Sequence, residues 1–193
     1  MSCVPSDCSV LMFIIVMCSH VRKKVRLCKQ GNNDVIFTPD ELALAIVQHF
    51  QPSGRLLEPC RGQGAFCRAF ERSGLKNYDT CEITEGVDFL TYNQQCDWII
   101  TNPPFSKISA FLEQAYKLNP QHIVFLMSAS AIWMNGKLTT MRNYGYHIAG
   151  IFEVESPYFR KLNNWPQSGF VLSAIHITKG NATGTIVHDH IRW

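Results

Sequence analysis

The chain reads DWIITNPPF from Asp97 to Phe105. The first five residues have the apolar, β-rich character of a buried strand. Pro103 and Pro104 then end the strand, because proline has no N–H group to give to a sheet and fixes its own backbone. We expect the side-chain oxygen of Asn102 and the Pro103 carbonyl to act as converging hydrogen-bond acceptors, with the Phe105 ring free to stack on a planar base. A rigid turn with a core phenylalanine is the simpler alternative.

Strands and helices alternate on both sides of this segment. A helix is predicted over residues 42–50, with Thr38 as its cap, Pro39 at its first position and Glu41 completing a capping box. Strands are predicted at residues 55–59, 78–83, 97–101, 122–127, 148–153 and 170–178, helices at 65–73, 106–118 and 135–144, and a short edge segment at 88–90. This alternation predicts a parallel α/β sheet. The last two strands lack a helix between them, so we expect an antiparallel hairpin at the sheet edge.

Composition indicates one globular domain. The chain has 193 residues, of which 46% are apolar and 17% charged, and a net charge of +3 that permits a polyanionic partner without requiring one. The eight cysteines form no CxxC pair, which gives a zinc site poor support, and we interpret them as reduced thiols of a cytoplasmic protein. No metal is expected.

The two ends of the chain differ from the middle. Residues 1–30 hold an apolar run that is too short to span a bilayer, and the positive charges follow it instead of preceding it. We interpret them as a peripheral N-terminal extension, with a membrane-surface anchor or a phosphate-binding basic arm as alternatives. We expect the main α/β domain to span residues 31–180, and residues 181–193 to be a solvated tail.

A glycine-rich turn, EPCRGQGAF from Glu58 to Phe66, follows the first predicted strand and opens a helix. Gly62 and Gly64 let the backbone approach a ligand and present amide donors to it. The turn is neither the dinucleotide fingerprint nor a phosphate loop. An acid at Glu58 would repel a pyrophosphate and suits a cationic or amine-bearing ligand. A plain tight turn is the alternative.

Two acidic positions follow. Glu82 ends the next predicted strand, about 20 residues beyond the glycine turn, where a ribose-binding acid belongs in a Rossmann-like unit. Asp88 and Phe89 could bind an adenine amino group and cover its ring. The alternative for Glu82 is a solvated glutamate at a strand end. The alternative for Asp88 and Phe89 is a polar turn residue before a core phenylalanine.

In these motifs and in their order, the sequence resembles the S-adenosylmethionine-dependent amino-methyltransferases, in particular the DNA adenine-N6 methyltransferases with an NPPF or DPPY motif. The resemblance covers residues 37–178. It implies an α/β, Rossmann-like, seven-stranded, mostly parallel sheet with an antiparallel last strand and helices on both faces. The catalytic motif would be Asn102, Pro103, Pro104 and Phe105. The cofactor, S-adenosylmethionine, would be held by Phe37, Thr38, Pro39, Glu58, Pro59, Gly62, Gly64, Glu82, Asp88 and Phe89.

The resemblance implies methyl transfer to an exocyclic amino nitrogen, with N6 of adenine in DNA as the expected target. No target-recognition domain of useful size fits between or after the motifs. Candidate substrate contacts are Lys107, Arg160, Lys161 and Trp165, of which the last three fall in a basic, aromatic loop. Protein glutamine N5 methylation and RNA adenine N6 or guanine N2 methylation are alternatives, as is an inactive cofactor-binding accessory subunit.

Overall fold

A computed structural model describes residues 37–134, 136–155, 172–182 and 184–193. Seven strands form one sheet in the order β2-β1-β3-β4-β6-β5-β7. Their bounds are β1 Leu56–Glu58, β2 Tyr78–Thr80, β3 Trp98–Thr101, β4 His122–Ser128, β5 Tyr146–Glu155, β6 Leu172–Lys179 and β7 Val187–Arg192. All neighbouring pairs are parallel except those that β6 makes with β4 and β5. The predicted α/β fold is confirmed.

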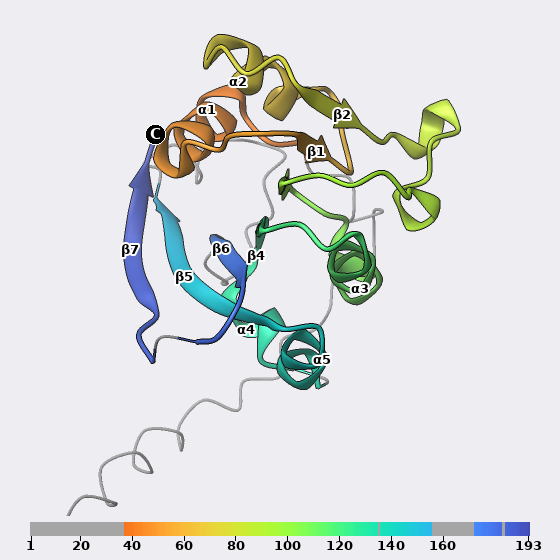
Figure 1. The fold of residues 1–193 in the computed structure, drawn as a ribbon. Helices are drawn as coiled ribbons and strands as arrows, with labels where there is room; N and C mark the ends of the chain where they lie inside the picture. Colours follow the sequence, from red (N-terminus) through yellow and green to blue (C-terminus); the bar gives the residue numbers. More distant parts are fainter. Residues whose placement is uncertain (1–36, 135, 156–171, 183) are drawn as a thin grey trace, which may run out of the picture. The chain divides into compact units, whose positions relative to one another are not determined.

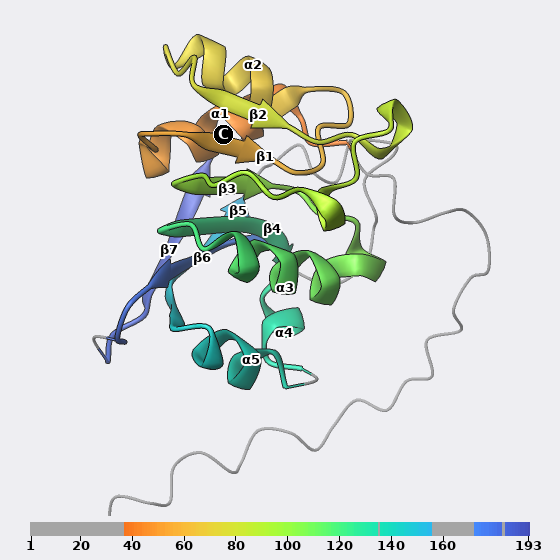
Figure 2. The same cartoon turned by 45° about the vertical axis from the view of Figure 1, so that its right-hand side comes forward.

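Helices cover both faces of the sheet (Figures 1 and 2). The helices are α1 Asp40–Phe50, α2 Ala65–Arg72, α3 Ile108–Leu118, α4 Ala129–Ile132 and α5 Lys137–Asn143, with short 3-10 helices η1 Ile83–Glu85, η2 Phe89–Thr91 and η3 Phe105–Lys107. Successive strand residues point to opposite faces. Leu56 accordingly packs in one core cluster with α1 and α2, and Leu57 in a second cluster with α3, α4 and α5.

The carboxyl half of the chain differs from the prediction in two places. The predicted antiparallel strand is β6 and pairs with β5, but it lies inside the sheet between β4 and β5 and not at the edge. Residues 181–193 are not a tail, because they contain β7, which pairs in parallel with β5 and forms the edge. The sequence around His188 is polar, so it did not predict this strand. The one buried residue of β7, Ile191, packs in the same core cluster as α1 and α2.

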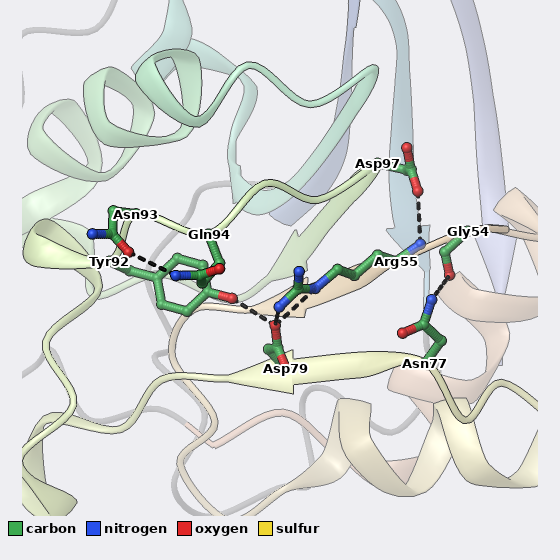
Figure 3. A network of polar contacts seen from close by, with 8 residues as sticks. All are labelled: Gly54, Arg55, Asn77, Asp79, Tyr92, Asn93, Gln94 and Asp97. Atoms are coloured by element: carbon green, nitrogen blue, oxygen red, sulfur yellow. Dashed lines mark hydrogen bonds and ion pairs between the residues drawn. The ribbon is translucent and has the colours of Figure 1, made fainter.

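Polar contacts join the amino ends of β1 and β3 (Figure 3). The Arg55 backbone N–H donates to Asp97 Oδ2 at 2.7 Å, and the Asp97 N–H donates to the Arg55 carbonyl at 2.8 Å. The Arg55 side chain and the Tyr92 hydroxyl both donate to Asp79 Oδ2 at 2.6 Å. The Tyr92 hydrogen bond, followed by Arg55, lowers the pKa of Asp79 despite its partial desolvation. These contacts fix the strands whose opposite ends carry the motifs.

A histidine pair packs near the same end of the sheet. Nδ1 of His122 lies 3.1 Å from Nε2 of His176, and the Trp98 ring stacks on His122 with a centroid distance of 4.0 Å. Burial lowers the pKa of His176 to about 4, and the positive charges of His122, His147 and His49 would add to this effect. His176 is therefore neutral in the folded protein near pH 7.

We expect this pair to make the protein acid-sensitive. A histidine whose pKa is depressed by folding contributes its full stability above the unfolded pKa of about 6.5, and loses it as the pH falls to the folded pKa. The wild type should therefore lose unfolding free energy as the pH falls from 6.5 to 4, and His176→Gln should lose about 2–3 kcal/mol less over the same range. This figure uses about 1.36 kcal/mol per pKa unit, reduced because His176 is partly exposed. Urea unfolding across this pH range measures the effect. Equal acid slopes in variant and wild type would contradict it.

Within the described ranges, no helix has the length and apolar character needed to cross a bilayer, and no cluster of histidine, cysteine and acidic side chains is suited to a metal ion. Four described cysteines, Cys60, Cys67, Cys81 and Cys96, are free thiols.

Candidate active site

The predicted motifs lie together at the carboxyl edge of the parallel strands. From β1 the chain crosses through α2 to β2 on one side, and then returns to β3 on the other side of β1. Ligands of open α/β sheets bind outside the carboxyl ends of strands at such a reversal of direction. The turns that follow β1, β2 and β3 are the glycine turn, the Glu82 segment and the NPPF segment.

A cavity of about 540 Å³ opens at this edge. The segment before α1, the glycine turn, the start of α2, the residues after β2 and the NPPF segment all contribute to it. Its lining residues are Phe37, Thr38, Cys60, Arg61, Gly62, Gln63, Ala65, Phe66, Glu82, Ile83, Thr84, Asn102, Pro103, Pro104, Phe105 and Lys107. The structure thus brings the whole predicted catalytic motif to one cavity with part of the predicted cofactor set.

The glycine turn is tied to Glu82. Gly62 has φ +53°, a conformation that favours glycine, and its N–H donates to Glu82 Oε2 at 2.8 Å. A Cβ atom at Gly62 would lie 3.4 Å from the Phe37 ring. The turn therefore passes closely between an aromatic ring and a carboxylate, both of which line the cavity.

Glu82 is an ionised acceptor. Desolvation alone would raise its pKa, but hydrogen bonds from the Thr84 hydroxyl at 2.8 Å, the Thr84 N–H and the Gly62 N–H outweigh burial, and its pKa is lowered. A carboxylate has about four lone-pair sites, so these bonds leave Glu82 able to accept hydrogen bonds from a ligand's hydroxyl groups.

Thr38 orients the amide of Asn102. The Asn102 Nδ2 atom donates to Thr38 Oγ1 at 3.2 Å, and both residues are half-buried at the cavity. Because the amide is planar, this bond also sets the direction of the Asn102 oxygen. The predicted capping role of Thr38 is wrong: Pro39 occupies the N-cap position of α1, and no side chain caps that helix. Pro39 itself does not line the cavity.

We expect Thr38→Val to lower the turnover number by about 10-fold, because the Asn102 amide loses the hydrogen bond that orients it. Loss of one such hydrogen bond typically costs about 1 kcal/mol or slightly more. Thr38→Ser keeps a hydroxyl and should restore most of the rate. Steady-state kinetics separates kcat from KM for the cofactor. A serine variant as slow as the valine variant would contradict this positioning role.

Glu58 does not reach the cavity. Its side chain is buried with 1% exposure, and Oε1 accepts hydrogen bonds from the Thr101 hydroxyl at 2.6 Å and the Cys60 N–H at 2.9 Å. Burial raises the pKa of this carboxyl to about 8, although both hydrogen bonds oppose the shift. Glu58 therefore joins the carboxyl ends of β1 and β3. Its contact with a cationic ligand stays a prediction.

Four other predicted positions lie outside the lining residues. Pro59 and Gly64 are buried in the turn, and Gly64 precedes α2. Asp88 accepts a hydrogen bond from the Leu90 N–H at 2.9 Å and caps η2, and the Phe89 ring packs on Phe111 in the core. Contact of these four residues with a cofactor stays a prediction.

The cavity also contains residues that the motifs did not single out. Ile83 and Thr84 adjoin Glu82, and their position beside a predicted ligand acid was the available signal. Arg61 lines the cavity and forms an ion pair with Glu85. Of the predicted substrate contacts, Lys107 lines the cavity, whereas Arg160, Lys161 and Trp165 lie outside the described residues.

No protein-family model matches this chain, and no curated protein matches its sequence. Solved structures do match. A protein assigned as an RNA methyltransferase from Pyrococcus horikoshii has a TM-score of 0.54 at 13% identity, over 75% of this chain and 83% of that one. One assigned as a class I S-adenosylmethionine-dependent methyltransferase from Listeria monocytogenes has 0.55 at 13% identity, over 86% and 68%. The ribosomal protein L11 methylase of Lactobacillus delbrueckii subsp. bulgaricus has 0.53 at 10% identity, over 73% and 78%. The chain therefore has the Rossmann-like fold of these methyltransferase structures.

Proposed function

We propose that the protein is an S-adenosylmethionine-dependent methyltransferase that acts on an exocyclic amino nitrogen, with N6 of adenine in DNA as the target. One observation carries this proposal: the Gly62 turn, the Glu82 carboxylate and the whole Asn102–Phe105 segment line the same cavity. The proposed cofactor site and the proposed amino-group site would then be adjacent, as direct transfer between two bound molecules requires.

The residues at the cavity fit this cofactor. Glu82 can accept hydrogen bonds from ribose hydroxyls, and its Gly62 and Thr84 bonds hold it in place. Gly62 leaves the backbone open to close approach, and Phe37 and Phe66 supply apolar wall. The lining is mostly apolar with few charged groups, which suits a nucleoside better than a pyrophosphate. Bound S-adenosylmethionine would supply an electrophilic methyl group on its sulfonium.

The protein's part in the reaction is to bind and orient the amino group. In this proposal the Asn102 oxygen, which is buried in the structure without bound substrate, and the Pro103 carbonyl accept its two hydrogens, which directs the nitrogen lone pair toward the methyl group. The nitrogen–carbon bond forms as the carbon–sulfur bond breaks, and the nitrogen then loses one proton to solvent. Phe105 stacks on the base, and a base in a duplex must first be flipped out, at a cost of about a few kcal/mol.

The test is incorporation of a labelled methyl group into separate DNA, RNA and protein pools, followed by nucleoside analysis of the product. We expect N6-methyladenine in DNA. If N6-methyladenine or N2-methylguanine were found in RNA alone, the substrate would be RNA and not DNA. Label in protein alone would overturn the nucleic-acid proposal, and cofactor binding with no transfer to any pool would indicate an accessory subunit.

Glu82→Gln should weaken binding of S-adenosylhomocysteine by about 10-fold or more, because charge-assisted hydrogen bonds to a carboxylate are roughly twice as strong as neutral ones. Isothermal titration calorimetry measures the change. Glu85→Gln, which removes a carboxylate that pairs with Arg61 but does not line the cavity, is the matched control and should bind within a few-fold of the wild type. Equal affinities of the two variants would argue against the ribose contact.

A further inference from the structure

Two large apolar side chains are exposed just beyond β4. Trp133 is 51% exposed and Met134 is 55% exposed. They follow α4, which begins directly after β4 (Figure 2). Because β4 runs parallel to β3, this segment leaves the sheet at the same edge as the Asn102–Phe105 segment. Neither residue lines the cavity, so the pair forms a separate surface at the edge where the cavity opens.

The position of this surface follows from the strand register. Thr101 pairs with Phe125, and β4 continues for three more residues to Ser128. At about 3.3 Å per residue this carries the chain about 10 Å past the end of β3 before α4 begins. Ile132 of α4 is fully buried in the core cluster on which Phe105 also packs. The residue before Trp133 is thus anchored in the same core cluster on which Phe105 packs.

One lysine lies beside the two side chains, and a second lines the cavity. Lys137 Nζ donates to the Met134 carbonyl at 3.4 Å, which places an ammonium group beside the exposed pair. Lys107 adds a second ammonium group at the cavity. An aromatic face accompanied by lysines suits a stacked base whose flanking phosphates meet the positive charges. An apolar peptide would gain nothing from these charges.

We propose that Trp133 and Met134 form a platform on which a base next to the target nucleotide stacks, with Lys137 and Lys107 near the adjoining phosphates. This inference rests on the proposed function and adds to it the surface that binds the substrate. It also supplies a binding surface within a chain that has no separate recognition domain among its described residues.

The experiment uses the full chain saturated with S-adenosylhomocysteine, so that no transfer occurs, and titrates in a single-stranded oligodeoxynucleotide with one central adenine. Stacking on an aromatic side chain contributes about 1–3 kcal/mol per base, which corresponds to a 5- to 150-fold change in Kd. We expect Trp133→Ala to raise Kd at least 10-fold. Trp133→Phe retains a ring and should bind within a few-fold of the wild type while losing the quenching of tryptophan fluorescence that stacking causes.

Val187→Ala is the matched control. Val187 is also 51% exposed but begins β7, the edge strand that lies three positions from β4 in the sheet, and its loss should leave Kd unchanged. An unchanged Kd in Trp133→Ala, with methyl transfer to DNA intact, would overturn the platform and leave the proposed function standing. Wild-type protein that methylates only protein would overturn both.

Discussion

Asn102→Ala is expected to lower the rate of methyl transfer by about 10²- to 10³-fold and to leave cofactor affinity nearly unchanged. The magnitude is typical of removing one preorganised polar group that acts on the reacting centre. The Asn102 oxygen and the Pro103 carbonyl are proposed to share the two amino hydrogens, so the variant retains only the carbonyl. Binding should survive because the proposed cofactor contacts come from Glu82 and the glycine turn.

Single-turnover kinetics with labelled cofactor measures the chemical step, and calorimetry with S-adenosylhomocysteine measures affinity. Asn93→Ala is the control, since Asn93 is exposed and follows η2, away from the cavity lining. A variant at Asn102 that transfers methyl groups at the wild-type rate would contradict the assigned role. A variant that no longer binds the cofactor would place Asn102 in the cofactor site instead.

Local rules predicted most of the scaffold. Predicted strands of five to nine residues between turn signals located β1, β3, β4, β5 and β6, and glycine ended α2 as expected. The order of the motifs along the chain then placed them at one edge, because parallel strands align their carboxyl ends. β7 escaped prediction because an edge strand with one buried residue has no alternating apolar pattern to detect.

The roles of individual side chains were harder to predict because they depend on contacts distant in sequence. Thr38 has the sequence signature of a helix cap, yet its hydroxyl bonds to Asn102, 64 positions away. Glu58 lies at the end of β1, and only the position of Thr101, 43 residues later, shows that its carboxyl is enclosed between strands. Sequence gives the residue type at a strand end, whereas the direction in which that residue points depends on the neighbouring strand.

The enclosed carboxyl of Glu58 leads to a large effect on stability. Its pKa is raised to about 8 by burial from a usual value of 4.5. A carboxyl whose pKa is raised by folding contributes its full stability below the unfolded pKa, and this contribution is lost as the pH rises through the folded pKa. Because of this group, the wild-type protein should lose stability as the pH rises from 4.5 to 8. The effect of His176 has the opposite sign, since His176 lowers stability as the pH falls.

Glu58→Gln removes the ionisation and keeps an amide oxygen that can accept from Thr101 and Cys60. Its unfolding free energy should rise relative to the wild type by about 3–5 kcal/mol between pH 4.5 and pH 8, at 1.36 kcal/mol per pKa unit, and the difference should level off above pH 8. Urea unfolding of both proteins at each pH cancels the contribution of His176. Glu41→Gln, at an exposed position of α1, should show no such trend. A stability difference between Glu58→Gln and the wild type that stays constant from pH 4.5 to pH 8 would contradict the raised pKa of this carboxyl.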